Sequence, residues 1–259
     1  MSEQIEKDKI EKEQIDKIYN CDCLEGMKHI PDGSIDAIIC DLPYGTTACA
    51  WDSVIPFDQL WEQYKRIIKP RGAIVLFGSQ PFTSSIVSSN PSMFGYEIIW
   101  EKEQATNPMF AKYGVLKSHE NILVFYKQAA TYNPQMEYGH SNYKSFKGDK
   151  GVGQVWKDNL RSEHRDCTYG SRFPKSILRF ARDSDAWHPT QKPVDLLRYL
   201  IRTYSNEGDT ILDNCMGSGT TAVACIKEKR HFIGFELNKE YFDKACKRID
   251  AERRQLSLF

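Results

Sequence analysis

The sequence has no long apolar run, no secretory signal and no cysteine spacing typical of a zinc site. Within its 259 residues, no stretch approaches the ~20 consecutive apolar residues that a membrane-spanning helix needs. The first 17 residues are charged throughout and contain no apolar core of a signal peptide. We therefore expect a cytoplasmic protein that does not enter a membrane.

The eight cysteines are scattered rather than grouped. Cys21 and Cys23 are too close together for the usual spacing of a zinc knuckle. Cys40 and Cys225 lie in apolar stretches, where a free thiol behaves as a small buried hydrophobe. We expect reduced thiols, as in cytosolic proteins, and no bound metal.

The formal net charge of zero does not by itself favour a nucleic-acid-binding protein. The charge is unevenly distributed, however, and distribution is what matters for such binding. Residues 140–182 contain ten Lys or Arg and four Asp or Glu, a balance of +6, with six aromatic residues interleaved. A solvated loop region explains charge alone equally well. The cluster therefore indicates nucleic-acid binding only in combination with other motifs.

Short apolar runs alternate with amphipathic stretches along most of the chain. The predicted strands are 35–40, 73–77, 96–100, 121–126, 210–213 and 231–236, and the predicted helices are 57–68, 194–204, 220–229 and 239–252. Residues 69–72, Lys-Pro-Arg-Gly, are predicted to end the first of these helices as a turn. Alternating strands and helices predict an α/β fold, with a mostly parallel central sheet flanked by helices. Residues 131–184 lack periodicity and are predicted to be an insertion of loops.

A glycine-rich turn, Gly217-Ser218-Gly219-Thr220, follows an apolar strand and opens a predicted helix. Glycines permit a tight turn and close approach of a ligand, and the start of the helix presents free N–H groups. Glu236 ends the next predicted strand, where an acid suits the two hydroxyls of an adenosine ribose. No lysine follows Gly219, which argues against a Walker-type phosphate loop. The pattern G-x-G-x-x-A leaves a nicotinamide-dinucleotide site open on this loop alone.

The segment Asp41-Leu42-Pro43-Tyr44 follows another apolar strand. Its carboxylate and a carbonyl of its turn can accept the two N–H bonds of an exocyclic amino group, and its ring can stack on a base. Such acceptors turn the nitrogen lone pair toward a methyl donor, so catalysis needs orientation and electrostatics rather than a covalent intermediate. A base inside a duplex must be flipped out to reach this site. Taken alone, the segment also fits a plain strand-ending turn.

Together the two motifs resemble those of the beta group of DNA amino-methyltransferases, over roughly residues 19–249. The resemblance implies a Rossmann-like S-adenosylmethionine-dependent methyltransferase fold with a small target-recognition insertion. After a charged segment (1–17), a catalytic half (18–130) would precede the insertion (131–184) and a cofactor half (185–259). The implied substrate is adenine N6 of a flipped-out base in double-stranded DNA, and the implied setting is restriction–modification.

The resemblance also implies roles for single residues. The catalytic set is Asp41, Leu42, Pro43 and Tyr44. The cofactor-binding set is Asp22, Cys23, Lys192, Asp213, Gly217, Ser218, Gly219, Thr220 and Glu236. The DNA-binding candidates in the insertion are Lys144, Lys147, Lys150, Arg161, Arg165 and Arg172. The family commonly has Pro at the position of Leu42, and Pro-Phe where this chain has Asn214-Cys215; the position of Leu42 acts through its backbone carbonyl.

Several alternatives stay open. The same chemistry serves cytosine N4, although an Asp rather than a Ser at position 41 favours adenine. Methylation of RNA or of a protein glutamine, and a non-catalytic DNA-binding relative, are the others. The basic insertion favours nucleic acid, and the intact Asp41, Tyr44, Gly217 and Gly219 argue against a non-catalytic protein. The resemblance is compatible with a homodimer.

Overall fold

The computed structural model describes residues 15–45, 52–106, 108–138, 171–184, 186–188 and 190–256. The chain divides into two compact units. Residues 1–133 and 176–259 form the larger unit, and residues 134–175 form the smaller one. In the described part of the smaller unit, Glu137 and Arg172 pair through their backbones in an isolated bridge.

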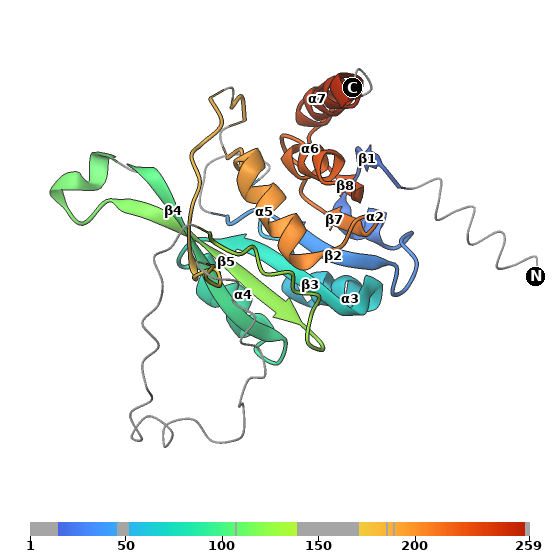
Figure 1. Ribbon diagram of the computed structural model, residues 1–259, viewed down its shortest axis with the longest axis horizontal. Helices are drawn as coiled ribbons and strands as arrows, with labels where there is room; N and C mark the ends of the chain where they lie inside the picture. The colour runs from blue at the N-terminus through green and yellow to red at the C-terminus, as the bar shows by residue number, and fades with distance from the viewer. Residues whose placement is uncertain are drawn as a thin grey trace, which may run out of the picture. The chain divides into compact units, whose positions relative to one another are not determined.

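The centre of the larger unit is a sheet in which the described residues form eight strands, in the order β1-β8-β7-β2-β3-β5-β4-β6 (Figure 1). The strands are β1 (Lys17–Tyr19), β2 (Ile35–Cys40), β3 (Ile68–Gly78), β4 (Phe94–Thr106), β5 (Lys117–Tyr126), β6 (Ile177–Arg179), β7 (Thr210–Asp213) and β8 (His231–Phe235). Strands β1, β8, β7, β2 and β3 run parallel, while β5 is antiparallel to both of its neighbours. The predicted α/β class and mostly parallel sheet are confirmed.

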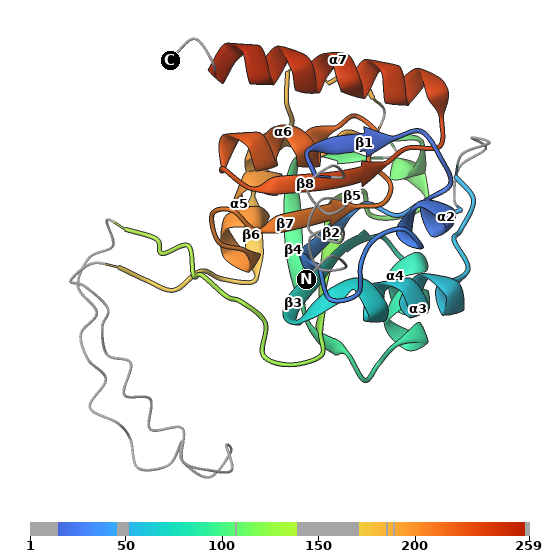
Figure 2. The same cartoon turned by 90° about the vertical axis from the view of Figure 1, so that its right-hand side faces the viewer.

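Helices cover both faces of the sheet (Figure 2). They are α2 (Cys23–Met27), α3 (Phe57–Ile67), α4 (Phe82–Ser89), α5 (Val194–Tyr204), α6 (Thr220–Lys227) and α7 (Lys239–Leu256), with a 3-10 helix η1 at Pro108–Lys112. Strand β2 shows why two cores form: Ile38 packs with α2, α3 and α4, and Ile39 packs with α5 and α6. Alternate side chains of a strand point to opposite faces, so a strand buried on both faces is apolar throughout. None of the helices in the described part of the chain is long and apolar enough to cross a bilayer.

The predicted turn at residues 69–72 is wrong, because this segment belongs to strand β3. Helix α3 ends at Ile67, and Ile68 already pairs with Ile35 of β2. Pro70 fits the strand because a register shift separates the Ile35 pairing from the Ala37 pairing, which leaves residues 69–72 outside the ladder with β2. The short elements β1, β6, α2 and α4 carry little periodicity and were not predicted.

The parallel strands determine where polar residues meet. Asp22, Asp41, Asp213 and Glu236 lie at or just beyond the carboxyl ends of β1, β2, β7 and β8. These four strands are consecutive in the sheet. In open α/β sheets, ligands bind in the crevice at this edge.

Candidate functional site

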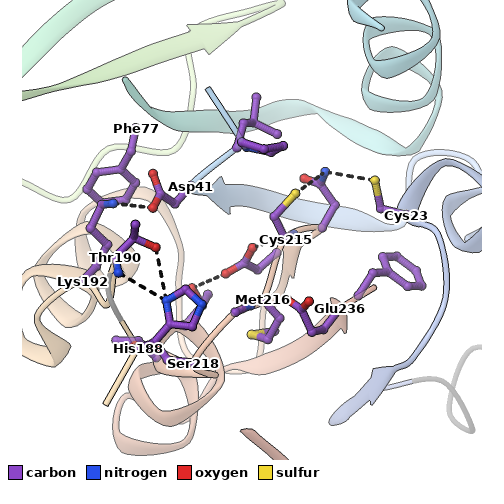
Figure 3. Close-up of a pocket in the computed structure, with 18 of the residues that line it drawn as sticks. Cys23, Asp41, Phe77, His188, Thr190, Lys192, Cys215, Met216, Ser218 and Glu236 are labelled. Carbon is purple, nitrogen blue, oxygen red and sulfur yellow. Dashed lines mark hydrogen bonds and ion pairs between the residues drawn. The ribbon is translucent and has the colours of Figure 1, made fainter. Parts of the chain in front are cut away.

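A cavity of about 560 Å³ opens at the carboxyl ends of these strands, and all four acids line it. This volume is typical of sites for small molecules and cofactors. The motif residues from both halves of the chain also line it, namely Cys23, Leu42, Pro43, Tyr44, Lys192, Gly217, Ser218 and Thr220. Figure 3 shows Asp41 and Glu236 on different strands of this pocket. The structure therefore brings the predicted catalytic and cofactor-binding sets together, with Gly219 adjoining them as the residue before α6.

Glu236 is held in place by the glycine-rich turn. One carboxylate oxygen accepts a 2.8 Å hydrogen bond from the backbone N–H of Gly217, and the other accepts one of 2.8 Å from Asn238. Gly217 and Gly219 have φ values of +51° and +76°, which L side chains rarely adopt. Burial raises the pKa of Glu236 although these backbone bonds act in the opposite direction. The result is a carboxylate that backbone N–H groups hold in a fixed orientation at the wall of the pocket.

Asp213 and Asp22 shape the backbone of the pocket. Asp213 accepts hydrogen bonds from the Thr221 hydroxyl at 2.6 Å and from the Cys215 N–H at 3.1 Å. Its burial raises the pKa of its carboxyl to about 6. Asp22 caps helix α2 by accepting from the N–H of Leu24 at 2.9 Å. Both acids therefore hold elements that form the wall.

Asp41 lies just beyond the end of strand β2, and both of its carboxylate oxygens have a partner. Tyr44 donates a 2.6 Å hydrogen bond to Asp41 Oδ1, and the ammonium of Lys192 pairs with Oδ2. The ring of Tyr44 stacks on Phe82, with centroids 4.9 Å apart and planes at 28°. Burial raises the pKa of Asp41, while Lys192 opposes this shift.

Lys192 belongs to a buried chain of alternating charges. Its ammonium also lies 3.3 Å from Glu120 Oε2, and Lys102 pairs with the other oxygen of Glu120. Burial alone would lower the pKa of Lys192, but Asp41 and Glu120 outweigh it and raise that pKa. For Glu120, burial is likewise outweighed by Lys192 and Lys102, so its pKa is lowered. Lys192 and Glu120 are thus held charged, whereas burial brings Asp41 closer to protonation.

Lys102 and Glu120 could not be assigned from the sequence. They lie on β4 and β5, where Trp100 pairs with Glu120 in the antiparallel ladder. Lys102 lies beside Glu120 because of this register, and no sequence motif in either strand indicates that the two residues pair. Lys192 was predicted from the family segment near the cofactor, and the structure places its ammonium on Asp41.

His188 forms part of the same wall. Its ring lies 4.4 Å from that of Tyr241, and its Nδ1 lies 3.2 Å from the Thr190 hydroxyl. Burial, with Lys192 and Lys244 nearby, lowers the pKa of His188 to about 4. The imidazole is therefore neutral at ordinary pH.

Of the six DNA-binding candidates, the structure describes only Arg172. Lys144, Lys147, Lys150, Arg161 and Arg165 lie outside the described residues. Arg172 is described, and its backbone exchanges hydrogen bonds of 2.8 and 2.9 Å with Glu137. Within the described ranges, no group of three or more His, Cys, Asp or Glu could hold a metal ion.

The sheet, the pocket at its carboxyl edge and the turn that holds Glu236 together form a Rossmann-like site of the kind that binds a nucleoside cofactor. A family model described as DNA methylase, of the N6/N4 type, matches residues 35–247. The chain belongs to this family of DNA methyltransferases.

Two curated relatives cover most of the chain. The Type II methyltransferase M.HpaI of Haemophilus parainfluenzae is 30% identical over 244 residues, which are 88% of this chain and 72% of the relative. The Type II methyltransferase M1.MboII of Moraxella bovis is 28% identical over 254 residues, 90% of this chain and 95% of the relative. Both relatives are Type II methyltransferases, in agreement with the family match.

Solved structures share the fold. The complex of M1.HpyAVI with S-adenosylmethionine has a TM-score of 0.60 and 26% identity, and covers 90% of this chain and 98% of that one. The cytosine-N4-specific PvuII DNA methyltransferase has a TM-score of 0.65 and 17% identity, and covers 90% and 85%. The second likeness concerns the fold alone. These comparisons do not distinguish methylation of adenine N6 from methylation of cytosine N4.

Proposed function

We propose that this DNA methyltransferase acts on adenine N6 of a base flipped out of double-stranded DNA. The proposal is supported by one observation: the predicted catalytic residues and the predicted cofactor-binding residues line the same pocket. Asp41, fixed by Tyr44 and Lys192, lies at one strand tip, and Glu236, fixed by Gly217, lies at another.

The pocket's donor set fits S-adenosylmethionine. Glu236 would accept hydrogen bonds from the ribose hydroxyls, and the turn at Gly217 and Gly219 would allow the ligand close to the backbone. Asp22 and Cys23 would lie at the adenine end, and Lys192 toward the methionine end. When bound, S-adenosylmethionine supplies a methyl group on a sulfonium that leaves as a neutral thioether.

Asp41 would orient the target amino group. Its carboxylate would accept one N–H bond of the adenine amino group, and a backbone carbonyl of Leu42 or Pro43 would accept the other. These acceptors favour a tetrahedral nitrogen whose lone pair faces the methyl carbon. Because burial raises the pKa of Asp41, this carboxylate is also suited to take the proton that the nitrogen releases.

Lys192 would keep Asp41 ionised and in position before the reaction. The phenol of Tyr44 would hold the second oxygen, and its ring, now stacked on Phe82, would extend the aromatic surface offered to the base. The same two acceptors fit the amino group of cytosine. Asp at position 41 is the feature that favours adenine.

The test is identification of the product. Unmethylated duplex DNA of mixed sequence is incubated with the protein and isotope-labelled S-adenosylmethionine, then digested to nucleosides. We expect label in N6-methyl-2′-deoxyadenosine and none with Asp41→Ala. Label in N4-methylcytosine would overturn the adenine assignment, and an active Asp41→Ala variant would overturn the role of Asp41.

A further inference from the structure

The hairpin of strands β4 and β5 continues beyond the rest of the sheet. Within the described ranges, β6 pairs with β4 no further than Glu101, and β3 pairs with β5 no further than Asn121. The two strands of the hairpin still pair with each other further out. Residues 102–106 and 117–120 therefore form a two-stranded arm that projects from the sheet, and residues 108–116 lie at its tip (Figure 1).

The arm stands at the edge of the sheet where the pocket opens. Strand β3 ends at Gly78, which pairs with Asn121 of β5, and β3 runs parallel to β2, whose end leads to Asp41. The arm therefore leaves the sheet at its carboxyl edge. Lys102 and Glu120, at the base of the arm, line the pocket itself. A DNA duplex that delivers a base to this pocket must approach the same edge, so the arm lies within its reach.

The tip of the arm exposes large apolar side chains. Met109, Tyr113 and Val115 are 87%, 85% and 99% exposed, which makes them the three most exposed large apolar side chains among the described residues. They belong to neither hydrophobic core, so the packing of the protein itself does not explain them. Exposed apolar side chains that gather in one place mark interaction sites.

The charge of the outer arm matches that of a nucleic acid. Residues 104–119 contain no Asp or Glu, although the whole chain has 35 of them. Lys112 and His119 are exposed, and Lys117 hydrogen-bonds to the hydroxyl of Ser79. A segment without acids that carries cations is attracted to phosphates. A second copy of this chain, with its net charge of zero, offers no such match.

We propose that the arm docks on the DNA duplex and that its apolar tip enters the base stack where the target base has left it. Tyr113 would stack on the neighbouring base pair, and Met109 and Val115 would exclude water from the gap. Apolar side chains inserted at a base step, and aromatic rings stacked on bases, offset part of the stacking that flipping removes. The inference rests on the proposed function, because the gap arises only if the target leaves the duplex.

The first experiment identifies what the tip of the arm touches. In the full-length protein, Tyr113 is replaced by the photoreactive residue p-benzoylphenylalanine, and the protein is irradiated with fluorescein-labelled duplex DNA of mixed sequence. The matched control carries the same residue at Tyr96, an exposed tyrosine near the opposite end of strand β4. Digestion and mass spectrometry then show which part of a nucleotide is attached. We expect label on the protein from position 113, attached to a base, and little label from position 96.

The second experiment tests the part of the tip in flipping. Tyr113→Ser removes the ring, whereas Tyr113→Phe keeps it. Methylation rates are measured with labelled S-adenosylmethionine on a duplex that carries the sequence found by mapping the product, and on the same duplex without the base opposite the target. Cofactor affinity is measured by calorimetry. Because Tyr113 is exposed and lies outside both cores, neither variant should change thermal unfolding.

The two duplexes should respond differently. We expect Tyr113→Ser to lower the rate on the intact duplex at least ~5-fold, the factor that corresponds to the loss of one ring stacked on a base. Tyr113→Phe should stay near the wild-type rate. Removal of the opposite base should restore most of the loss, because an unpaired base is easier to flip. Cofactor affinity should not change in either variant.

Other outcomes overturn the proposal. Two protein chains crosslinked through position 113 without label would show that the arm binds a second copy. Label from position 113 that is no stronger than from position 96, or that is attached only to sugars, would show that the tip does not enter the stack. Equal losses of rate on both duplexes would show that the ring has no part in flipping. If no base is methylated, the proposed function fails, whereas the crosslink still decides whether the arm enters DNA.

Discussion

Lys192 and Asp41 lie 151 residues apart in the sequence and form an ion pair inside the pocket. The pair joins the segment before helix α5 to the tip of strand β2, and thereby links the two halves of the molecule at the proposed reaction centre. Both carboxylates that Lys192 contacts are partly buried, so the pair is little screened by solvent. Removing the lysine would leave Asp41 and Glu120 as neighbouring buried acids without their shared cation.

Replacing Asp41 by Ala should abolish methylation and leave cofactor affinity nearly unchanged. The carboxylate would act on the target amino group, and the loss of one oriented electrostatic partner costs about 10²-fold or more in rate. The rate is measured with labelled S-adenosylmethionine, and affinity by calorimetry. Asp58→Ala, an exposed change on helix α3, is the control. Wild-type turnover in Asp41→Ala would contradict the assignment.

Replacing Lys192 by Met should move the acidic limb of the rate–pH profile to higher pH. Lys192 lowers the pKa of Asp41, so its loss raises that pKa, and a higher pH is then needed to ionise Asp41. Glu120→Gln should shift the limb in the opposite direction, because the charge of Glu120 raises the pKa of Asp41. The exposed Lys247→Met is the control.

The two opposite shifts separate an electrostatic role from a merely structural one. A variant that only loosened the pocket would lower the rate at every pH and leave the limb in place. Shifts of the same sign in Lys192→Met and Glu120→Gln would therefore refute the proposed coupling to Asp41.

Replacing Glu236 by Ala should weaken binding of S-adenosylmethionine. A lost charge-assisted hydrogen bond costs roughly 1.5–3 kcal/mol, or about one to two orders of magnitude in the dissociation constant. The variant also frees the N–H of Gly217, so Glu236→Gln, which keeps an acceptor there, is measured beside it. Glu240→Ala, on the surface of α7, is the control. An unchanged dissociation constant in calorimetry would remove Glu236 from the site.

The site residues at the ends of the parallel strands could be predicted from the sequence, because each of them follows a recognisable strand. Asp41 and Glu236 follow apolar runs, and parallel strands bring such ends to one edge. The other two members of the charge chain, Lys102 and Glu120, could not be predicted, because antiparallel strands rather than parallel strand ends bring them together. Lys102 and Glu120 meet through antiparallel register between β4 and β5, which depends on packing along the whole hairpin.

Asp213 should make the stability of the protein depend on pH. Its folded-state pKa of about 6 lies above the ordinary value of 3.8. The protonated form is therefore favoured in the folded protein, and the stability this contributes is fully present below about pH 3.8 and lost as pH rises through about 6. Asp213→Asn stays uncharged at every pH. The unfolding free energy of the wild type relative to this variant should fall by on the order of 3 kcal/mol between pH 4 and pH 7.

Urea unfolding at several pH values measures this difference, with the exposed Asp58→Asn as the control. A gap between wild type and Asp213→Asn that stays constant from pH 4 to pH 7 would mean that Asp213 titrates at its ordinary value. Its hydrogen bonds from Thr221 and Cys215 would then offset the effect of burial on its pKa.

Neutralising the basic insertion should weaken DNA binding without regard to sequence. The +6 balance of residues 140–182 motivates this prediction, because each phosphate that a lysine or arginine neutralises releases a counterion. Changing Lys144, Lys147 and Lys150 together to Gln should reduce the slope of log affinity against log salt by ~0.9 for each phosphate that is no longer neutralised. Lys244, Lys247 and Arg254 on helix α7, changed together, provide a control of equal charge.

By contrast, substituting an arginine that reads a base should relax the choice of base at one position. The candidates are Arg161, Arg165 and Arg172.

The two kinds of interaction are told apart by measuring affinity against salt together with methylation mapped on DNA of mixed sequence. A residue that binds phosphate affects the salt slope and keeps the methylated sites, whereas a residue that reads a base changes the sites and has a small effect on the slope. If every variant of the insertion retained both the wild-type slope and the wild-type sites, recognition would have to lie elsewhere. The charge of residues 140–182 would then serve only to keep a surface segment hydrated, the alternative that its composition alone leaves open.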